Sequence, residues 1–208
     1  MHIPVKDILH QAPVIPVLVI ENLVHAVPLA RALYQGGLPV LEITLRTPVA
    51  LDAIRAIKTA VPDAIVGAGT VITADDISDC GAAGAQFMVS PGATPALLGA
   101  AAAQATPLLP GVASASEAMQ LLEHGISYMK FFPADAAGGT AFLKSLAGPL
   151  PQITFCPTGG INLEKAGEYL ALPNVVCVGG SWMAAPTLVN NEDWTKIETL
   201  ARQAAALQ

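Results

Sequence analysis

The sequence predicts an α/β fold, a (β/α)8 TIM barrel that spans residues 1–208 as a single catalytic domain, with a short extra helix at the N-terminus. Eight short apolar segments recur about every 23 residues, and each is followed by a segment with helical spacing or composition. Near-continuous apolar strands are typical of a parallel sheet that helices cover on its outside. A doubly wound open sheet is the alternative, but no strand is followed by the G-x-G-x-x-G fingerprint of that fold.

The predicted strands end at or near Gly, Pro, Ser or Thr. They are 14–20, 39–44, 64–69, 85–90, 106–111, 128–134, 153–157 and 175–180. The predicted helices are 23–35, 48–60, 73–83, 94–104, 114–124, 138–147, 162–170 and 193–206, and the extra helix lies within 4–12. Ser114 and Glu117 form a capping-box pattern, and Asn162 precedes another helix. Pro28 indicates that its helix begins or kinks nearby.

Composition excludes several classes of protein. The chain is 53% hydrophobic and 12% charged, which predicts a packed chain rather than a disordered one. Its net charge of −6 argues against nucleic-acid binding. The longest unbroken apolar segment, 96–103, is too short to cross a membrane. Lys6 and Asp7 occupy the position where a signal peptide has its apolar core, so we expect a cytoplasmic protein.

The cysteines and histidines do not predict a metal site. Cys80, Cys156 and Cys177 are far apart in sequence, so we expect buried thiols rather than a disulfide framework or a zinc site. The four histidines occur at no strand end and in no metal-ligand spacing, and we expect them at the surface. They are His2, His10, His25 and His124.

Charged residues within the predicted strands mark the candidate site, because TIM-barrel enzymes work at the C-terminal ends of their strands. In PVLEITLRTP, residues 39–48, the alternation of strand side chains places Glu42, Thr44 and Arg46 on one face. The opposite face is Leu and Ile and suits the covering helices. The polar face therefore points into the barrel, with Glu42 deeper and Arg46 at the rim. The structural alternative is a Glu42–Arg46 ion pair that only fills the interior.

Lys130 lies within the apolar run YMKFFPA, residues 128–134. The structural alternative is a lysine whose stem extends outward to water, but a covered barrel offers little water at mid-strand. Burial disfavours the charged ammonium, and a free amine can attack a ketone to form a Schiff base. We expect covalent catalysis on a keto substrate, with Glu42 moving protons.

Two glycine pairs lie at the ends of the last two predicted strands. Gly159–Gly160 lies in CPTGGIN and Gly179–Gly180 in VGGSW. Glycines let backbone N–H groups approach an anion closely, and a helix that begins near Asn162 adds its positive end. Loops after the seventh and eighth strands are the recurrent phosphate site of this barrel. Thr70 and Thr158 are candidate hydroxyl donors at the same mouth.

The motifs together resemble the 2-keto-3-deoxy-6-phosphogluconate (KDPG) aldolase family, whose members often also act as 4-hydroxy-2-oxoglutarate (KHG) aldolases. They span nearly the whole chain in order: EITLRT (42–47), VGAGTV (66–71), SPG (90–92), KFFPA (130–134), PTGGI (157–161) and VGGSW (178–182). The resemblance implies a class I aldolase of the Entner-Doudoroff pathway, a cytoplasmic homotrimer without metal or other cofactor. It implies that the substrate is a phosphorylated keto acid and that no nucleic acid or membrane is a partner.

The resemblance also implies a role for each matching residue. Lys130 is the Schiff-base nucleophile, Glu42 is the general acid/base, and Arg46 binds the pyruvyl carboxylate with Thr70 nearby. The remaining substrate-binding positions are Pro91, Phe132, Thr158, Gly159, Gly160, Gly180 and Ser181. The one departure is Asp135, where the family more often has glutamate.

Other functions stay open on the sequence alone. A sister group that cleaves the galactonate epimer of the substrate is similar too, although its second-strand motif usually lacks an arginine like Arg46. A phosphate-binding barrel isomerase or transferase would share the glycine loops without needing a buried amine. A non-catalytic barrel could hold Glu42, Arg46 and Lys130 as a structural triad.

Overall fold

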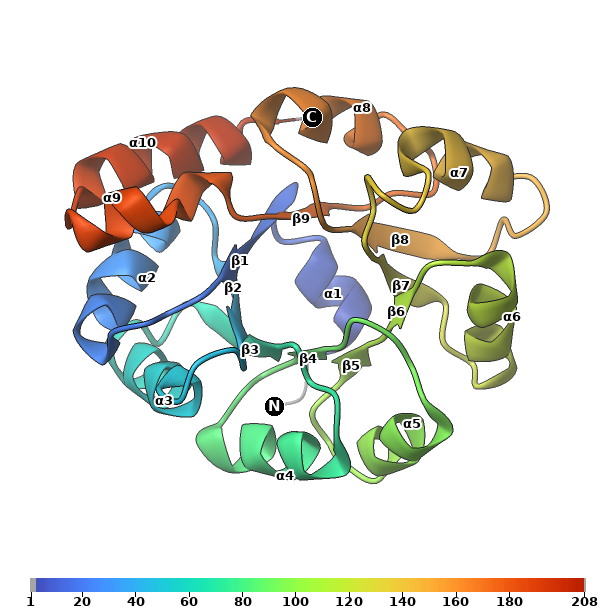
Figure 1. The fold of residues 1–208 in the computed structure, drawn as a ribbon, viewed down its shortest axis with the longest axis horizontal. Coiled ribbons are helices and arrows are strands. Elements are labelled where there is room, and N and C mark those ends of the chain that lie inside the picture. Colours follow the sequence, from blue (N-terminus) through green and yellow to red (C-terminus); the bar gives the residue numbers. More distant parts are fainter. Residues whose placement is uncertain (1–2, 208) are drawn as a thin grey trace.

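The structure, a computed structural model, describes residues 3–207 and has parallel strands surrounded by helices (Figure 1). Within those residues the strands form a six-stranded sheet of order β5-β4-β3-β2-β1-β9 and a three-stranded sheet of order β6-β7-β8. Every pair of neighbouring strands is parallel. The strands are β1 (Val14–Leu18), β2 (Val40–Thr44), β3 (Ile65–Gly69), β4 (Met88–Val89), β5 (Leu108–Leu109), β6 (Gly111–Val112), β7 (Tyr128–Phe131), β8 (Thr154–Pro157) and β9 (Val178–Gly180).

The expected strand at 106–111 is two short strands, β5 and β6, separated by Pro110. Proline has no backbone N–H and cannot donate to a ladder of hydrogen bonds. Its carbonyl still accepts a hydrogen bond from the backbone N–H of Lys130 at 2.9 Å. Pro110 therefore marks the point where the chain passes from the six-stranded sheet to the three-stranded sheet.

The other ends of the two sheets meet where β8 lies beside the chain that leads into β9. Isolated bridges pair Phe155 with Val175 and Thr158 with Gly179, both parallel. β9 pairs in turn with β1 of the six-stranded sheet. The strands thus surround a shared interior, into which the C-terminal ends of β2, β7, β8 and β9 open.

Residues 3–207 contain ten α-helices and two 3-10 helices, and α2 to α10 lie outside the strands (Figure 1). The capping patterns at Ser114 and Asn162 are confirmed, since the two side chains accept hydrogen bonds from Glu117 N and Lys165 N. The expected helices are present, and α9 and the short 3-10 helix η2 are additional to them. The α-helices are α1 (Val5–Leu9), α2 (Ala26–Gln35), α3 (Ala50–Ala60), α4 (Ala74–Ala83), α5 (Pro95–Ala102), α6 (Ala115–Glu123), α7 (Gly139–Leu146), α8 (Leu163–Leu170), α9 (Pro186–Asn190) and α10 (Trp194–Ala205). The 3-10 helices are η1 (Leu23–His25) and η2 (Trp182–Ala184).

The apolar core has two parts. The larger cluster lies between the strands and the outer helices and includes Leu41 and Ile43 of β2. The smaller cluster lies inside the ring of strands, where Ile8 and Leu9 of α1 pack with inward-facing strand residues (Figure 1). The extra N-terminal helix therefore fills the interior at the N-terminal ends of the strands. The chemistry is left to the opposite ends.

One histidine differs from the expectation. His10 and His124 are exposed, and His2 lies outside the described residues. The side chain of His25 is only 14% exposed, so its expected place at the surface is wrong. It packs edge-on against Trp194 and pairs with Glu192 at 3.5 Å. Both partners come from the C-terminal end of the chain, which no local pattern around His25 reveals.

The three cysteines are free and buried, as expected. Burial, with Asp76 and Asp79 nearby, raises the pKa of Cys80 to about 12. Cys156 and Cys177 are neighbours inside the strands, and a hydrogen bond between the two thiols, together with burial, raises the pKa of Cys177 well above its usual value. Because the pKa of each is raised, neither the Cys80 thiol nor the Cys177 thiol is suited to nucleophilic chemistry near neutral pH.

Two kinds of feature are absent from residues 3–207. None of the helices there is both long and apolar enough to cross a membrane. The same residues contain no group of three or more His, Cys, Asp or Glu side chains placed to hold a metal ion.

Leu9→Ala is expected to lower the free energy of unfolding by about 2–4 kcal/mol, because Leu9 is 1% exposed in the inner cluster and its loss leaves a cavity there. Urea denaturation measures this change. The control is Met119→Ala on α6, whose side chain is 53% exposed and should matter by less than about 0.5 kcal/mol. Equal effects of the two substitutions would contradict the interior position of α1.

Candidate active site

The centre of the candidate site is a buried ion pair between strands of different sheets. Nζ of Lys130 on β7 lies 3.3 Å from Oε1 of Glu42 on β2. Their side chains are 6% and 5% exposed. A hydrogen bond of this length is within the range that catalytic pairs show before substrate binds. The expectation that both side chains face the interior is confirmed, and the lysine stem does not extend to the surface.

Glycines on β3 make room for this pair. A Cβ atom on Gly69 would overlap the carboxylate of Glu42, and one on Gly67 would overlap the ring of Phe87. Gly67 is the residue that pairs with Glu42 in the β2–β3 ladder. The glycines of VGAG are therefore required by close approach, in addition to ending a strand.

Arg46 lies two residues beyond the end of β2 and is exposed, as expected for a residue at the rim. Its Nε donates a hydrogen bond to Oγ1 of Thr70 at 3.0 Å. Thr70 has a φ of 60°, a left-handed conformation that is uncommon for a β-branched residue. Because Glu42 pairs with Lys130, the alternative of a Glu42–Arg46 ion pair is wrong. The guanidinium keeps its terminal nitrogens available at the mouth.

A cavity of about 130 Å³ opens at the ends of β1, β2, β7, β8 and β9. Gly159 and Gly160 have φ values of 105° and 77°, which turn the loop after β8 in a way that favours glycine. Thr158 is buried and bridges to Gly179, where a Cβ atom would overlap its hydroxyl. The cavity is lined by Val17, Arg46, Phe132, Thr158, Gly159, Gly160, Ile161, Gly179, Gly180 and Ser181. We call the residues at the ends of β8 and β9, Thr158–Gly160 and Gly179–Ser181, the glycine cradle.

Phe132 connects the amine to this cavity. Its ring lies 5.3 Å from Nζ of Lys130, and the same ring lines the cavity wall. A cation over an aromatic face at this distance is an attractive contact. The structure thus brings together Lys130, Glu42, Phe132, Arg46 with Thr70, and the whole glycine cradle.

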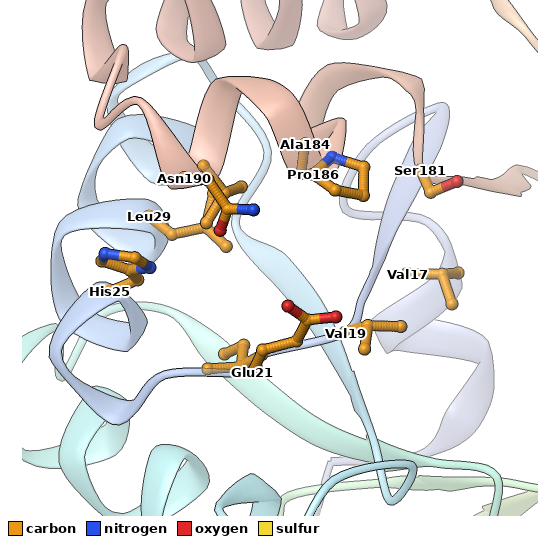
Figure 2. A pocket seen from close by; sticks show the side chains of 11 residues that line it. Val17, Val19, Glu21, His25, Leu29, Ser181, Ala184, Pro186 and Asn190 are labelled. Carbon is orange, nitrogen blue, oxygen red and sulfur yellow. The ribbon is translucent and has the colours of Figure 1, made fainter.

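Pro91, an expected substrate-binding residue, lies apart from this group, and so does Glu21, which follows β1. Pro91, in the loop after β4, has its carbonyl against Gly111 of β6 and does not line the cavity. Glu21 lines a second cavity of about 300 Å³, where its carboxylate faces Asn190 (Figure 2). The two cavities share Val17 and Ser181. Neither is lined by Lys130 or Glu42, but the smaller one includes Phe132, which contacts the Lys130 amine.

Sequence patterns did not point to two residues at the site. Val17 lines the cradle from β1, where an apolar strand residue gives no signal of a binding role. Lys165 on α8 forms an ion pair with Asp135 at 2.7 Å, next to the cradle. Its position in the first turn of a helix is unremarkable in sequence, and only the packing of the loop after β7 reveals its partner.

A parallel α/β fold with a buried amine beside a carboxylate, and an anion cradle at the same strand ends, is suited to enzymes that form an imine with a phosphorylated carbonyl compound. The model of the KDPG and KHG aldolase family matches residues 5–200. The chain belongs to this family of aldolases, and it is a lyase.

Similar proteins cover almost the whole chain. A 2-dehydro-3-deoxy-phosphogluconate aldolase of Pseudoalteromonas atlantica is 53% identical over 97% of this chain and 94% of its own length. The structure of KDPG aldolase from Legionella pneumophila with pyruvate captured as a covalent carbinolamine is 50% identical, with a TM-score of 0.94 over 96% of this chain and 97% of that one. The aldolase of Zymomonas mobilis ZM4 with 3-phosphoglycerate is 48% identical, with a TM-score of 0.91 over 98% of this chain and 95% of that one.

Gly69→Ala is expected to lower the aldolase activity about a hundredfold, the range that a displaced proton-transfer group costs. The added methyl would occupy the space of the Glu42 carboxylate. Gly99→Ala on α5 is the control, because a Cβ atom there meets nothing within 4 Å. Steady-state kinetics and thermal unfolding measure the two effects. Full activity in a folded Gly69→Ala protein would contradict the proposed importance of the carboxylate position.

Proposed function

We propose that this protein is a class I aldolase that cleaves KDPG to pyruvate and D-glyceraldehyde 3-phosphate. We propose that it also cleaves 4-hydroxy-2-oxoglutarate, which yields pyruvate and glyoxylate. The observation that carries the proposal is the Lys130 amine, buried 3.3 Å from the Glu42 carboxylate at the C-terminal ends of the strands. The identity of about half of all positions with named KDPG aldolases supports the choice of substrate.

In the proposed reaction, Lys130 and Glu42 first form the imine. Nζ of Lys130 first gives a proton to the Glu42 carboxylate, the free amine attacks the C2 ketone of the substrate, and Glu42 passes the proton on to the resulting oxygen. The carbinolamine then loses water as Glu42 assists the second proton transfer, which leaves a protonated imine on the lysine. The contact between Lys130 and Glu42 places the proton donor beside the nitrogen in both steps.

The protonated imine then accepts the electrons of the C3–C4 bond. Glu42 removes the proton of the C4 hydroxyl, the C3–C4 bond breaks, and the aldehyde half leaves as glyceraldehyde 3-phosphate. The enamine that remains on Lys130 takes a proton at C3, and water releases pyruvate and the free amine. Every proton that leaves the substrate therefore returns to it or to water, and no redox partner is needed.

The two ends of the substrate are proposed to bind at opposite sides of the mouth. Arg46, held by Thr70, takes the pyruvyl carboxylate, since a guanidinium can make paired hydrogen bonds to a carboxylate. The phosphate lies in the glycine cradle, with Thr158, Gly159, Gly160, Gly180 and Ser181 as its donors. Phe132 completes the substrate site beside the amine. Fixing both ends supplies much of the rate by holding C2 against the amine.

We further propose that the two sheets act as one closed (β/α)8 barrel and that residues 1–208 form a single catalytic domain. The bridges from β8 to β9 support closure on one side, and the single residue Pro110 between β5 and β6 supports it on the other. In a closed barrel, Lys130 and Glu42 keep a fixed distance although their strands lie in different sheets.

The chain is proposed to assemble as a homotrimer, as the resemblance to the family implies. Val24 and Ile72, which follow β1 and β3 in the chain, are apolar side chains with 66% and 59% exposure, and a second copy would cover such side chains. Sedimentation equilibrium is expected to give three times the 21.3 kDa chain mass, about 64 kDa. A mass of one chain at micromolar concentration would contradict this proposal and leave the catalytic proposal unaffected.

Incubation with pyruvate followed by borohydride is expected to add a reduced pyruvyl group to Lys130, because borohydride traps an imine as a stable amine. Mass spectrometry of the peptide around Lys130 measures the adduct, and Lys130→Ala should abolish both adduct and cleavage. The control is Lys58→Ala. In the unchanged protein the Lys58 amine donates a hydrogen bond to the backbone carbonyl of Gly84, so it takes no part in the candidate site.

The outcome of the same experiment separates the rival functions. An adduct on Lys130 together with faster cleavage of the gluconate than of the galactonate epimer supports the proposal. An adduct with preference for the galactonate epimer would replace the substrate and keep the mechanism. An unlabelled Lys130, or turnover by Lys130→Ala, would overturn the class I mechanism.

A further inference from the structure

The loop after β7 supports the glycine cradle from behind. The backbone N–H groups of Ala134 and Asp135 donate to the carbonyls of Thr158 and Gly159 at 2.8 and 3.0 Å. A Cβ atom on Gly160 would meet the side chain of Asp135. The carboxylate of Asp135 is therefore held close to the backbone that forms the proposed phosphate site.

A carboxylate in that place opposes the binding of a phosphate, because like charges repel over a short distance. Lys165, in the first turn of α8, neutralises this charge, because its Nζ forms an ion pair with Oδ2 of Asp135 at 2.7 Å. Burial and then Asp135 raise the pKa of Tyr169, so the Asp135 charge is felt on the neighbouring face of α8. The lysine is the only cation that pairs with Asp135 among residues 3–207.

The ion pair between Lys165 and Asp135 contributes little to the stability of the fold. The side chains of Lys165 and Asp135 are 43% and 46% exposed, and exposed ion pairs contribute little to the free energy of unfolding. The helix start is already capped, because Oδ1 of Asn162 accepts from the backbone N–H of Lys165. Removing the amino group of Lys165 should therefore leave the fold and the helix intact.

We propose that Lys165 is a positioning residue for phosphorylated substrates, which acts by cancelling the charge of Asp135 beside the glycine cradle. The inference rests on the proposed function, since it assigns the phosphate of the substrate to that cradle. On this proposal, Lys165 affects the binding of the phosphate end of the substrate and not of the pyruvyl end. The covalent steps at Lys130 do not depend on it.

The sign of each substitution follows from the charge that remains beside the cradle. Lys165→Ala leaves an unpaired carboxylate, and the KM for KDPG is expected to rise about three- to tenfold with kcat unchanged. Asp135→Asn leaves an unpaired ammonium, and KM should fall or stay the same. The double variant restores neutrality and should have a KM near that of the unchanged protein. Lys165→Arg keeps the charge and should rescue binding.

The decisive experiment measures these variants with KDPG and with the same keto acid without its phosphate. The phosphate-free substrate is the matched control, and its KM should not respond to Lys165→Ala. The difference between Lys165→Ala and the unchanged protein should shrink in about 0.5 M salt, because salt screens exposed charges. Thermal unfolding of each variant shows whether the fold is kept.

Binding of inorganic phosphate, followed by calorimetry, tests the inference without turnover. A loss of phosphate affinity in Lys165→Ala that the double variant restores supports it, even if KDPG proves not to be the substrate. Unchanged phosphate affinity, an equal rise in KM for both substrates, or failure of the double variant to restore KM would each overturn it. Absence of KDPG cleavage by the unchanged protein contradicts only the proposed function.

Discussion

The contact between Lys130 and Glu42 is the constraint on which the rest of the structure depends. β2 belongs to the six-stranded sheet and β7 to the three-stranded sheet, so the two side chains meet only if the sheets face each other across one interior. Removing either partner would leave a buried charge without compensation, which is more costly than the pair is stabilising. The arrangement of the two sheets around one interior is therefore what makes the chemistry of the site possible.

The surroundings of the pair follow from the same requirement. Gly69 leaves room for the Glu42 carboxylate, and α1 fills the opposite end of the interior with Ile8 and Leu9. The Lys130–Glu42 pair thus lies between the apolar side chains of α1 on one side and the polar groups at the C-terminal ends of the strands on the other. Little water reaches it from below, and electrostatic interactions are stronger in such a medium than in bulk water. The proposed substrate enters from the side that carries Arg46 and the glycine cradle.

Local patterns were enough to predict the centre of the site, because the direction of a strand side chain depends only on its position in the alternation. Glu42 and Lys130 could be placed inside for that reason, and the glycine pairs could be placed at strand ends. Contacts between distant segments could not be predicted. The burial of His25 needs Trp194, and the neutralisation of Asp135 needs Lys165. The split at Pro110 also depends on how neighbouring strands pair.

Net charge explains why the mouth relies on local groups. With a charge of −6, the protein as a whole repels the proposed substrate, which carries a carboxylate and a phosphate. Arg46 and the backbone N–H groups of the cradle must therefore offset this repulsion at short range. Any carboxylate near the cradle adds to the cost, and Asp135 is fixed there by its own backbone hydrogen bond to Gly159. The loop after β7 thus keeps its backbone contact with the cradle, and the Lys165 ammonium offsets the repulsion between the Asp135 carboxylate and the proposed phosphate.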